Sequence, residues 1–158
     1  MIMQGFFDTR QLGHAPLKEL HNGAWTSYAE CPARATNIAE ALETLAPARD
    51  FGLAPIARVH DADYLAFLQS AHGEWRAAGR DGDAIGYTWP VVARRKLALT
   101  RIDARLGRYS FDAATPIADG TWDGAYWSAQ TALSALDAVL DDGRTAFALC
   151  RPPGHDAG

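Results

Sequence analysis

An apolar run at residues 145–150 constrains the fold of this chain more than any other stretch. Turn-forming residues bound it on both sides: Asp142-Gly143 precedes it, and Arg151-Pro152-Pro153-Gly154-His155 follows it. Such a run predicts a buried strand in a parallel sheet. The two prolines remove backbone donors, so the sheet ladder must stop near Arg151, and Gly154 allows a tight bend. The strand therefore delivers His155 to the carboxyl end of the sheet, where open α/β sheets bind ligands.

The composition is that of an ordinary soluble domain and excludes several classes of partner. Of the 158 residues, 48% are hydrophobic and 22% are charged, which is enough apolar content for one domain with a core. The net charge of −4 argues against a nucleic-acid partner, and the sequence predicts no signal peptide and no membrane span. Cys31 and Cys150 lie far apart without a Cys-x-x-Cys spacing, which favours a reducing, cytoplasmic location.

Periodicity and turn residues predict alternating strands and helices along the chain. We expect a short strand at residues 5–7, a helix at 32–45, a strand at 51–59, a helix capped by Asp61 or Asp63, and a helix at 121–140. This order predicts a parallel sheet with helices on its faces. The apolar positions expected to be buried are Ile38, Ala41, Leu42 and Leu45 in the first helix, Tyr64, Leu65, Phe67, Leu68 and Ala71 in the second, and Trp122, Ala125, Tyr126, Ala129, Ala132, Leu133, Leu136 and Val139 in the third.

Residues 79–120 show no sustained periodicity, which indicates a functional loop or an interaction segment. A solvated face is the ordinary explanation of the basic residues in this stretch, which are Arg94, Arg95, Lys96, Arg101, Arg105 and Arg108.

Isolated histidines elsewhere carry little functional signal. His14, His21 and Glu19 could serve as ligands, but isolated histidines in a loop are favoured as solvated side chains. His60 is favoured as a structural histidine near a helix start.

The residues Arg151-Pro152-Pro153-Gly154-His155-Asp156-Ala157-Gly158 resemble the Arg-Pro-Pro-Gly-His-His-Ala motif of the histone deacetylase and acetylpolyamine amidohydrolase family. Residues 59–68 and the Gly120-Thr121-Trp122 stretch resemble other parts of the same family, so the likeness spans nearly the whole chain. Residues 75–79 and 82–85 favour the acetylpolyamine branch. Asp156 is a departure, because the family motif has a second histidine at that position.

The resemblance implies an α/β, arginase/deacetylase-like three-layer fold with a mostly parallel sheet, truncated after the histidine motif. Residues 1–158 would form the N-terminal part of a single deacetylase domain, with an inserted loop at 79–120. It also implies a zinc-dependent hydrolase that removes acetyl groups by metal-activated water. His155 would hydrogen-bond that water, and Asp156 stands where the family has its general base. The family's metal ligands, two aspartates and a histidine, would lie beyond residue 158, so we assign no metal residue in this chain.

The resemblance further implies the substrate class and an assembly. The substrate would be a small acetylated amine, an acetylpolyamine or acetyl-lysine. The loop at 79–120 would pack against a second subunit in a homodimer, and Asp83 and Asp103 would face the amine end of the substrate.

Two alternatives remain open at the level of sequence. A non-catalytic truncated relic or interaction module is favoured by Asp156 and by the missing ligand segments. A hydrolase dyad of His155 and Asp156 with a serine or cysteine is weakly supported, because adjacent side chains seldom point at each other. Cys150 lies inside the predicted strand, where a small buried apolar group is expected.

Overall fold

The computed structural model describes residues 3–42, 44–90, 98–110 and 112–153. The chain forms two compact units. The first comprises the segment up to Ala15, the segment from Glu30 to Asp61 and the segment from Gly120 onward. The second comprises Pro16–Ala29 and Ala62–Asp119.

The first unit is built on a parallel sheet. Its strands are β1 (Gln4–Phe6), β4 (Leu45–Ala46) and β5 (Ala146–Ala148), and they lie in the order β4-β1-β5. Both neighbours run parallel to β1, with Gly5 opposite Leu45 on one side and Phe147 on the other. The strands predicted at 5–7 and 145–150 and their parallel pairing are thereby confirmed. The predicted burial of the second strand is wrong for β5 itself, because its three residues are only half-buried.

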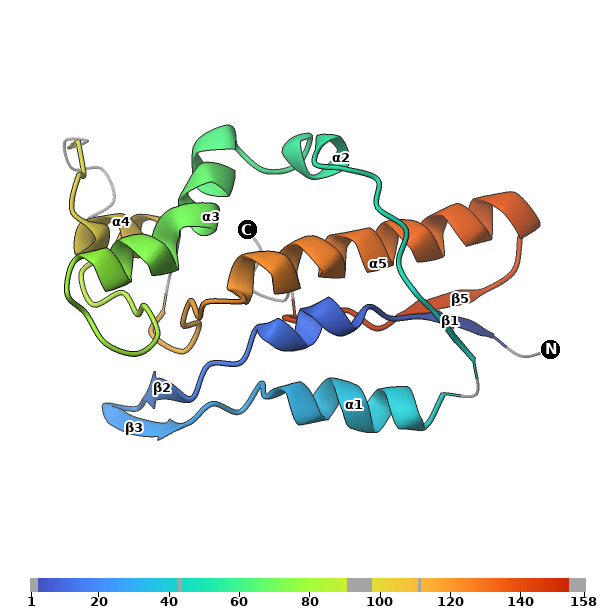
Figure 1. The fold of residues 1–158 in the computed structure, drawn as a ribbon, viewed down its shortest axis with the longest axis horizontal. Coiled ribbons are helices and arrows are strands. Elements are labelled where there is room, and N and C mark those ends of the chain that lie inside the picture. Colours follow the sequence, from blue (N-terminus) through green and yellow to red (C-terminus); the bar gives the residue numbers. More distant parts are fainter. Residues whose placement is uncertain (1–2, 43, 91–97, 111, 154–158) are drawn as a thin grey trace. The chain divides into compact units, whose positions relative to one another are not determined.

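Helix α5 (Thr121–Asp142) lies along β1 and β5 in Figure 1. It ends at Gly143, whose φ of 68° is left-handed and whose N–H donates to the Val139 carbonyl. The predicted buried stripe is not confirmed: its members in the first half of the helix are only half-buried, and in the second half Leu136 is 52% exposed and Val139 is also exposed. The helix instead buries Gln130, Thr131, Ser134 and Ala135. Gln130 and Ser134 face inward because they bind backbone groups of the loop before α2, and Thr131 because it binds the side chain of Gln11.

The segments between β1 and residue 61 differ from two predictions. The 3-10 helix η1 (Thr9–Gly13) follows β1. Helix α1 (Pro32–Glu40) is shorter than the predicted 32–45, because Leu45 belongs to β4 and pairs with β1. The strand predicted at 51–59 is absent from these described residues, where the chain forms the short helix α2 (Ala54–Ala57) with a proline in its first turn.

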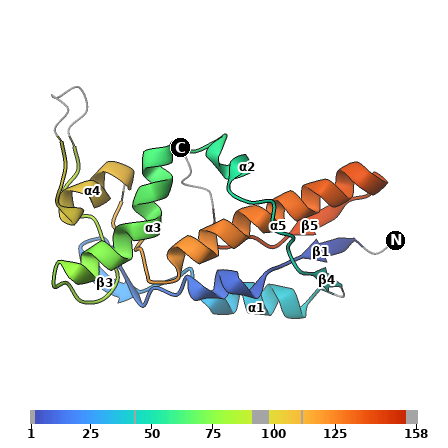
Figure 2. The same cartoon turned by 45° about the horizontal axis from the view of Figure 1, so that its top comes forward.

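The second unit contains a helical core. Helix α3 (Ala62–Ala77) packs against α4 (Ile102–Tyr109), and the two can be followed in Figure 2. The helix predicted after Asp61 or Asp63 is confirmed. The core residues are Phe67, Ala71, Trp75, Ala84, Ile102 and Leu106.

The described part of the segment 79–120 contains more regular structure than the sequence predicts. It contains α4, and the backbones of Ala84 and Ile117 form a bridge. Arg105 pairs with Glu74, and Arg108 lies 3.3 Å from Asp63, so these two arginines form ion pairs in addition to facing solvent. The basic residues at 94–96 lie outside the described residues.

A β-hairpin in the second unit was not predicted. Strands β2 (Lys18–His21) and β3 (Ala24–Ser27) pair antiparallel around Asn22 and Gly23. Both turn residues have positive φ, 50° and 78°. An Asn-Gly pair is the strongest short-range hairpin signal, because both residues tolerate this conformation.

Candidate functional site

The predicted site begins where β5 ends, at the start of the histidine motif. The ladder between β1 and β5 continues to Leu149, whose N–H donates to the Phe6 carbonyl at 2.9 Å. The peptide bond between Arg151 and Pro152 is cis. The predicted catalytic residues His155 and Asp156 lie outside the described residues, which end at Pro153.

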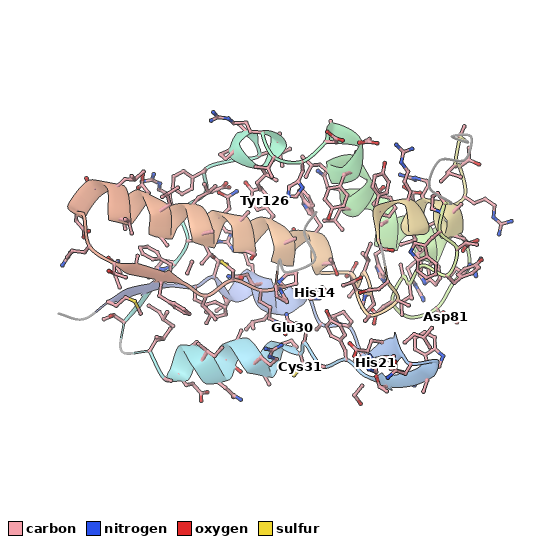
Figure 3. The ribbon with its side chains drawn as sticks, turned by 180° about the vertical axis from the view of Figure 1, so that it is seen from behind. His14, His21, Glu30, Cys31, Asp81 and Tyr126 are labelled. Carbon is pink, nitrogen blue, oxygen red and sulfur yellow. The ribbon has the colours of Figure 1, made fainter. Side chains whose placement is uncertain are left out.

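Arg151 anchors the start of the motif in the interior of the first unit. Its side chain is one of the largest that are fully buried, with 2% of the residue exposed. The guanidinium donates to the carbonyls of Gln11, His14 and Glu30. Its Nε lies 3.5 Å from a carboxylate oxygen of Glu30, which compensates the buried charge. His14 and Glu30 come from separate loops on the same side of α5 (Figure 3), so Arg151 ties the motif to both loops.

Gln11 makes a second connection to the motif from η1, and it is completely buried. Its Nε2 donates to Thr131 Oγ1 at 3.0 Å and to the Leu149 carbonyl at 3.2 Å. Its Oε1 accepts from the Arg151 N–H at 2.5 Å. One carboxamide therefore binds the backbone on both sides of Cys150.

His14 is buried, which corrects the interpretation of this residue as a solvated side chain. It is 3% exposed, and its Nδ1 lies 2.8 Å from Thr121 Oγ1 at the start of α5. Burial, and secondarily the charge of Arg151, lowers the pKa of His14 to about 4. His14 is therefore neutral at neutral pH. His21 is exposed in β2, as predicted.

Comparison with known proteins identifies the family. The family model described as "Histone deacetylase domain" matches residues 28–158. The chain belongs to the histone deacetylase family. This chain is 42% identical to acetylpolyamine amidohydrolase 2 of Pseudomonas aeruginosa, in a match that covers 96% of this chain and 45% of that protein. It is 41% identical to the acetylpolyamine amidohydrolase of Burkholderia pseudomallei, in a match that covers 98% of this chain and 46% of that protein. The predicted resemblance and its acetylpolyamine branch are confirmed.

A solved structure confirms the fold class of this family member. The crystal structure of acetylpolyamine aminohydrolase from Burkholderia pseudomallei, obtained with an iodide soak, matches with a TM-score of 0.85 and 38% sequence identity. The match covers 97% of this chain and 46% of that one. The chain therefore has the α/β fold with a parallel sheet of the deacetylases, and it spans less than half the length of the relatives it matches.

The two acidic residues predicted to bind substrate lie in the second unit of this deacetylase-family chain. An Asp83 carboxylate oxygen accepts from the Leu17 N–H at 3.0 Å. Asp103 is buried, and its Oδ2 accepts from Arg80 at 2.7 Å and from Arg101 at 2.9 Å. Its Oδ1 has no hydrogen-bond partner among the described residues. Both carboxylates bind groups of their own unit, and their role in substrate binding stays a prediction.

The described residues of this family member contain few metal-binding side chains close together. No group of three or more His, Cys, Asp or Glu in the described ranges could hold a metal ion. Cys150 is half-buried and its Sγ lies 3.4 Å from the Ser128 carbonyl, and burial raises the pKa of its thiol. The described residues by themselves therefore do not form a zinc site. In addition, no helix of the described chain has the length and apolar character needed to cross a membrane.

Proposed function

We propose that this chain carries the histidine-motif part of a deacetylase that hydrolyses small acetylated amines. The observation that carries the proposal is the identity of about 40% to several acetylpolyamine amidohydrolases over nearly the whole chain. The geometry at the end of β5 supports it, because a buried arginine and a buried glutamine hold the segment that leads to His155. The carboxyl end of a parallel sheet is where α/β proteins place ligands.

His155 and Asp156 are the residues we propose for the chemistry. Hydrolysis of an acetamide requires removal of a proton from the attacking water and delivery of a proton to the leaving amine. We assign His155 to hydrogen-bonding the water and Asp156 to the proton transfer, at the position of the family's second histidine. Zinc is the cofactor that family membership suggests, with ligands from outside the described residues.

The substrate and the assembly are proposed on the same family basis. A small acetylated amine suits the net charge of −4, and Asp83 and Asp103 are the acidic residues we propose for its amine end. We propose that residues 79–120 mediate a homodimer within a single deacetylase domain. The free cysteines are compatible with the cytoplasm as the location.

Amine release tests the proposed function. A form of the protein that also carries the family's metal-ligand segments is supplied with zinc and acetylputrescine, because we expect residues 1–158 alone to be inactive. Free amine and bound zinc are measured, and its His155→Asn variant is the matched control. We expect amine release to fall by roughly 10²–10³-fold in the variant, because that is the usual effect of removing one side chain that hydrogen-bonds the reacting atoms. Equal, background release from both proteins would contradict the catalytic proposal and favour the interaction module.

A further inference from the structure

The backbone between β5 and the histidine motif is no longer paired with β1 after Leu149. In the parallel pairing of β1 with β5, Phe6 lies opposite Ala148, and the Phe6 carbonyl accepts from the Leu149 N–H. A parallel ladder repeats every two residues, so the next residue of β1 to bind this edge would be Asp8. It would accept from the Arg151 N–H and donate to the Leu149 carbonyl. The chain instead turns into η1, where the Asp8 carbonyl accepts from the Gln11 N–H.

The side chain of Gln11 supplies the two bonds that the strand no longer makes. Its Nε2 donates to the Leu149 carbonyl at 3.2 Å, and its Oε1 accepts from the Arg151 N–H at 2.5 Å. One carboxamide thus reproduces the donor and the acceptor of a strand residue at the position of Asp8. Because the site is completely buried, loss of the carboxamide would leave both backbone groups without their partner.

Two further contacts hold Gln11 in place, one to its carboxamide and one to its backbone. The Thr131 hydroxyl on α5 donates to the Trp127 carbonyl at 2.7 Å, so its Oγ1 can only accept from Gln11 Nε2, which lies 3.0 Å away. Arg151 donates in return to the backbone carbonyl of Gln11 at 3.3 Å. Gln11 and Arg151 therefore hold each other through side chain and main chain, directly before the cis peptide bond that opens the motif.

We propose that Gln11 is a positioning residue for the histidine motif. Its carboxamide extends the β5 ladder by one step without a strand, and so sets the point from which the chain turns toward His155. The link to catalysis rests on the proposed deacetylase function, whereas the extension of the ladder does not. The sequence contains no local sign of this role, because Gln11 and Arg151 are 140 residues apart.

The chain provides a matched control in Gln130. This glutamine is also completely buried in the first unit, and it binds a backbone segment in the same way. Its Oε1 accepts from the Phe51 N–H at 2.8 Å, and its Nε2 donates to the Gly52 carbonyl at 3.0 Å. Gln130→Met and Gln11→Met thus remove the same pair of backbone bonds from different segments, and Gln11→Met also removes the bond to Thr131.

Amide hydrogen exchange measured by NMR on residues 1–158 tests the proposal. In Gln11→Met, we expect the Arg151 amide to exchange at least roughly tenfold faster than in the parent, while the Phe51 amide is unchanged. In Gln130→Met, the Phe51 amide should accelerate and the Arg151 amide should not. An unchanged Arg151 amide in Gln11→Met, or equal acceleration of that amide in both variants, would overturn the proposal.

A second variant keeps the proposal testable if Gln11→Met does not fold. Gln11→Glu retains an acceptor for the Arg151 N–H but loses the donor to Leu149. We expect the Arg151 amide to keep most of its protection in this variant. Exchange of that amide at the rate of an unfolded peptide, with the β1 amides still protected, would refute the role of Gln11.

Turnover separates the positioning role from general stability. In a form of the protein that releases amine from acetylputrescine, Gln11→Met should lower kcat by roughly tenfold or more relative to Gln130→Met, with little change in KM. Equal kcat in the two variants would remove the link to catalysis. Absence of turnover in the parent would instead count against the proposed function, and the exchange experiment would still decide the role of Gln11.

Discussion

Protonation of His14 should destabilise the folded chain in mildly acidic solution. The imidazole is buried against Thr121, at the start of α5. The Arg151 guanidinium donates to the His14 carbonyl, so a positive charge lies close by. Desolvation and this charge lower the pKa of His14 from 6.5 to about 4. Between these two pH values the unfolded chain binds a proton that the folded chain does not.

The sign and size of the effect follow from this difference in pKa. The stability that neutral His14 contributes is fully present above pH 6.5, falls as the pH falls, and is lost at about pH 4. At ~1.36 kcal/mol for each pKa unit, the whole difference is on the order of 3 kcal/mol, and roughly 2 kcal/mol of it is lost at about pH 5. Arg10 lowers the pKa of Asp8 below 3.8, so the contribution of that carboxylate is lost only at lower pH.

Urea unfolding near pH 7.5 and near pH 5 measures this contribution. We compare the parent with His14→Asn, whose carboxamide can still pair with Thr121 but does not titrate. The parent should lose roughly 2 kcal/mol more free energy of unfolding than the variant between the two conditions. His21→Asn, at an exposed position in β2, should behave like the parent. Equal losses in the parent and in His14→Asn would refute the reasoning.

Three further changes test other parts of the structure. Arg151→Met should cost roughly 3–5 kcal/mol of unfolding free energy in urea, because it leaves three backbone carbonyls without their buried donor. Arg144→Met at the surface should change it little. Comparable losses would contradict the anchoring role of Arg151. Asp156→His should raise amine release from acetylputrescine by ~10²–10⁴-fold in a catalytically complete protein, with little change in bound zinc. An Asp156 parent that is already as fast would argue against the role of this position. Tyr87→Asp, at a side chain that is 57% exposed within segment 79–120, should halve the mass in light scattering, and an unchanged mass would remove Tyr87 from the proposed dimer interface.

Several features could be predicted from the sequence because they depend on residues that are close together in the chain. The apolar run before Arg151 forms a parallel strand, since turn residues bound it and its side chains suit a sheet. The helix after Asp61 buries Leu65, Phe67 and Ala71, which its spacing predicted. The Asn22-Gly23 turn has an equally local cause, because both residues tolerate positive φ. Family membership also follows from the sequence, because the motif and its flanking stretches match directly.

Other features depended on partners that are distant in sequence. Leu45 ends a helix by its periodicity, but pairing with β1 places it in a strand. The buried side of α5 is polar because Gln130 and Ser134 bind backbone groups of a loop some 80 residues earlier, which no periodicity reports. An isolated histidine is ordinarily solvated, yet His14 is buried. Its imidazole contacts Thr121 of α5, and its carbonyl accepts a hydrogen bond from Arg151. The sequence alone therefore determined local conformation and family, whereas the tertiary structure decided which polar groups are buried, because burial is a property of contacts between distant segments.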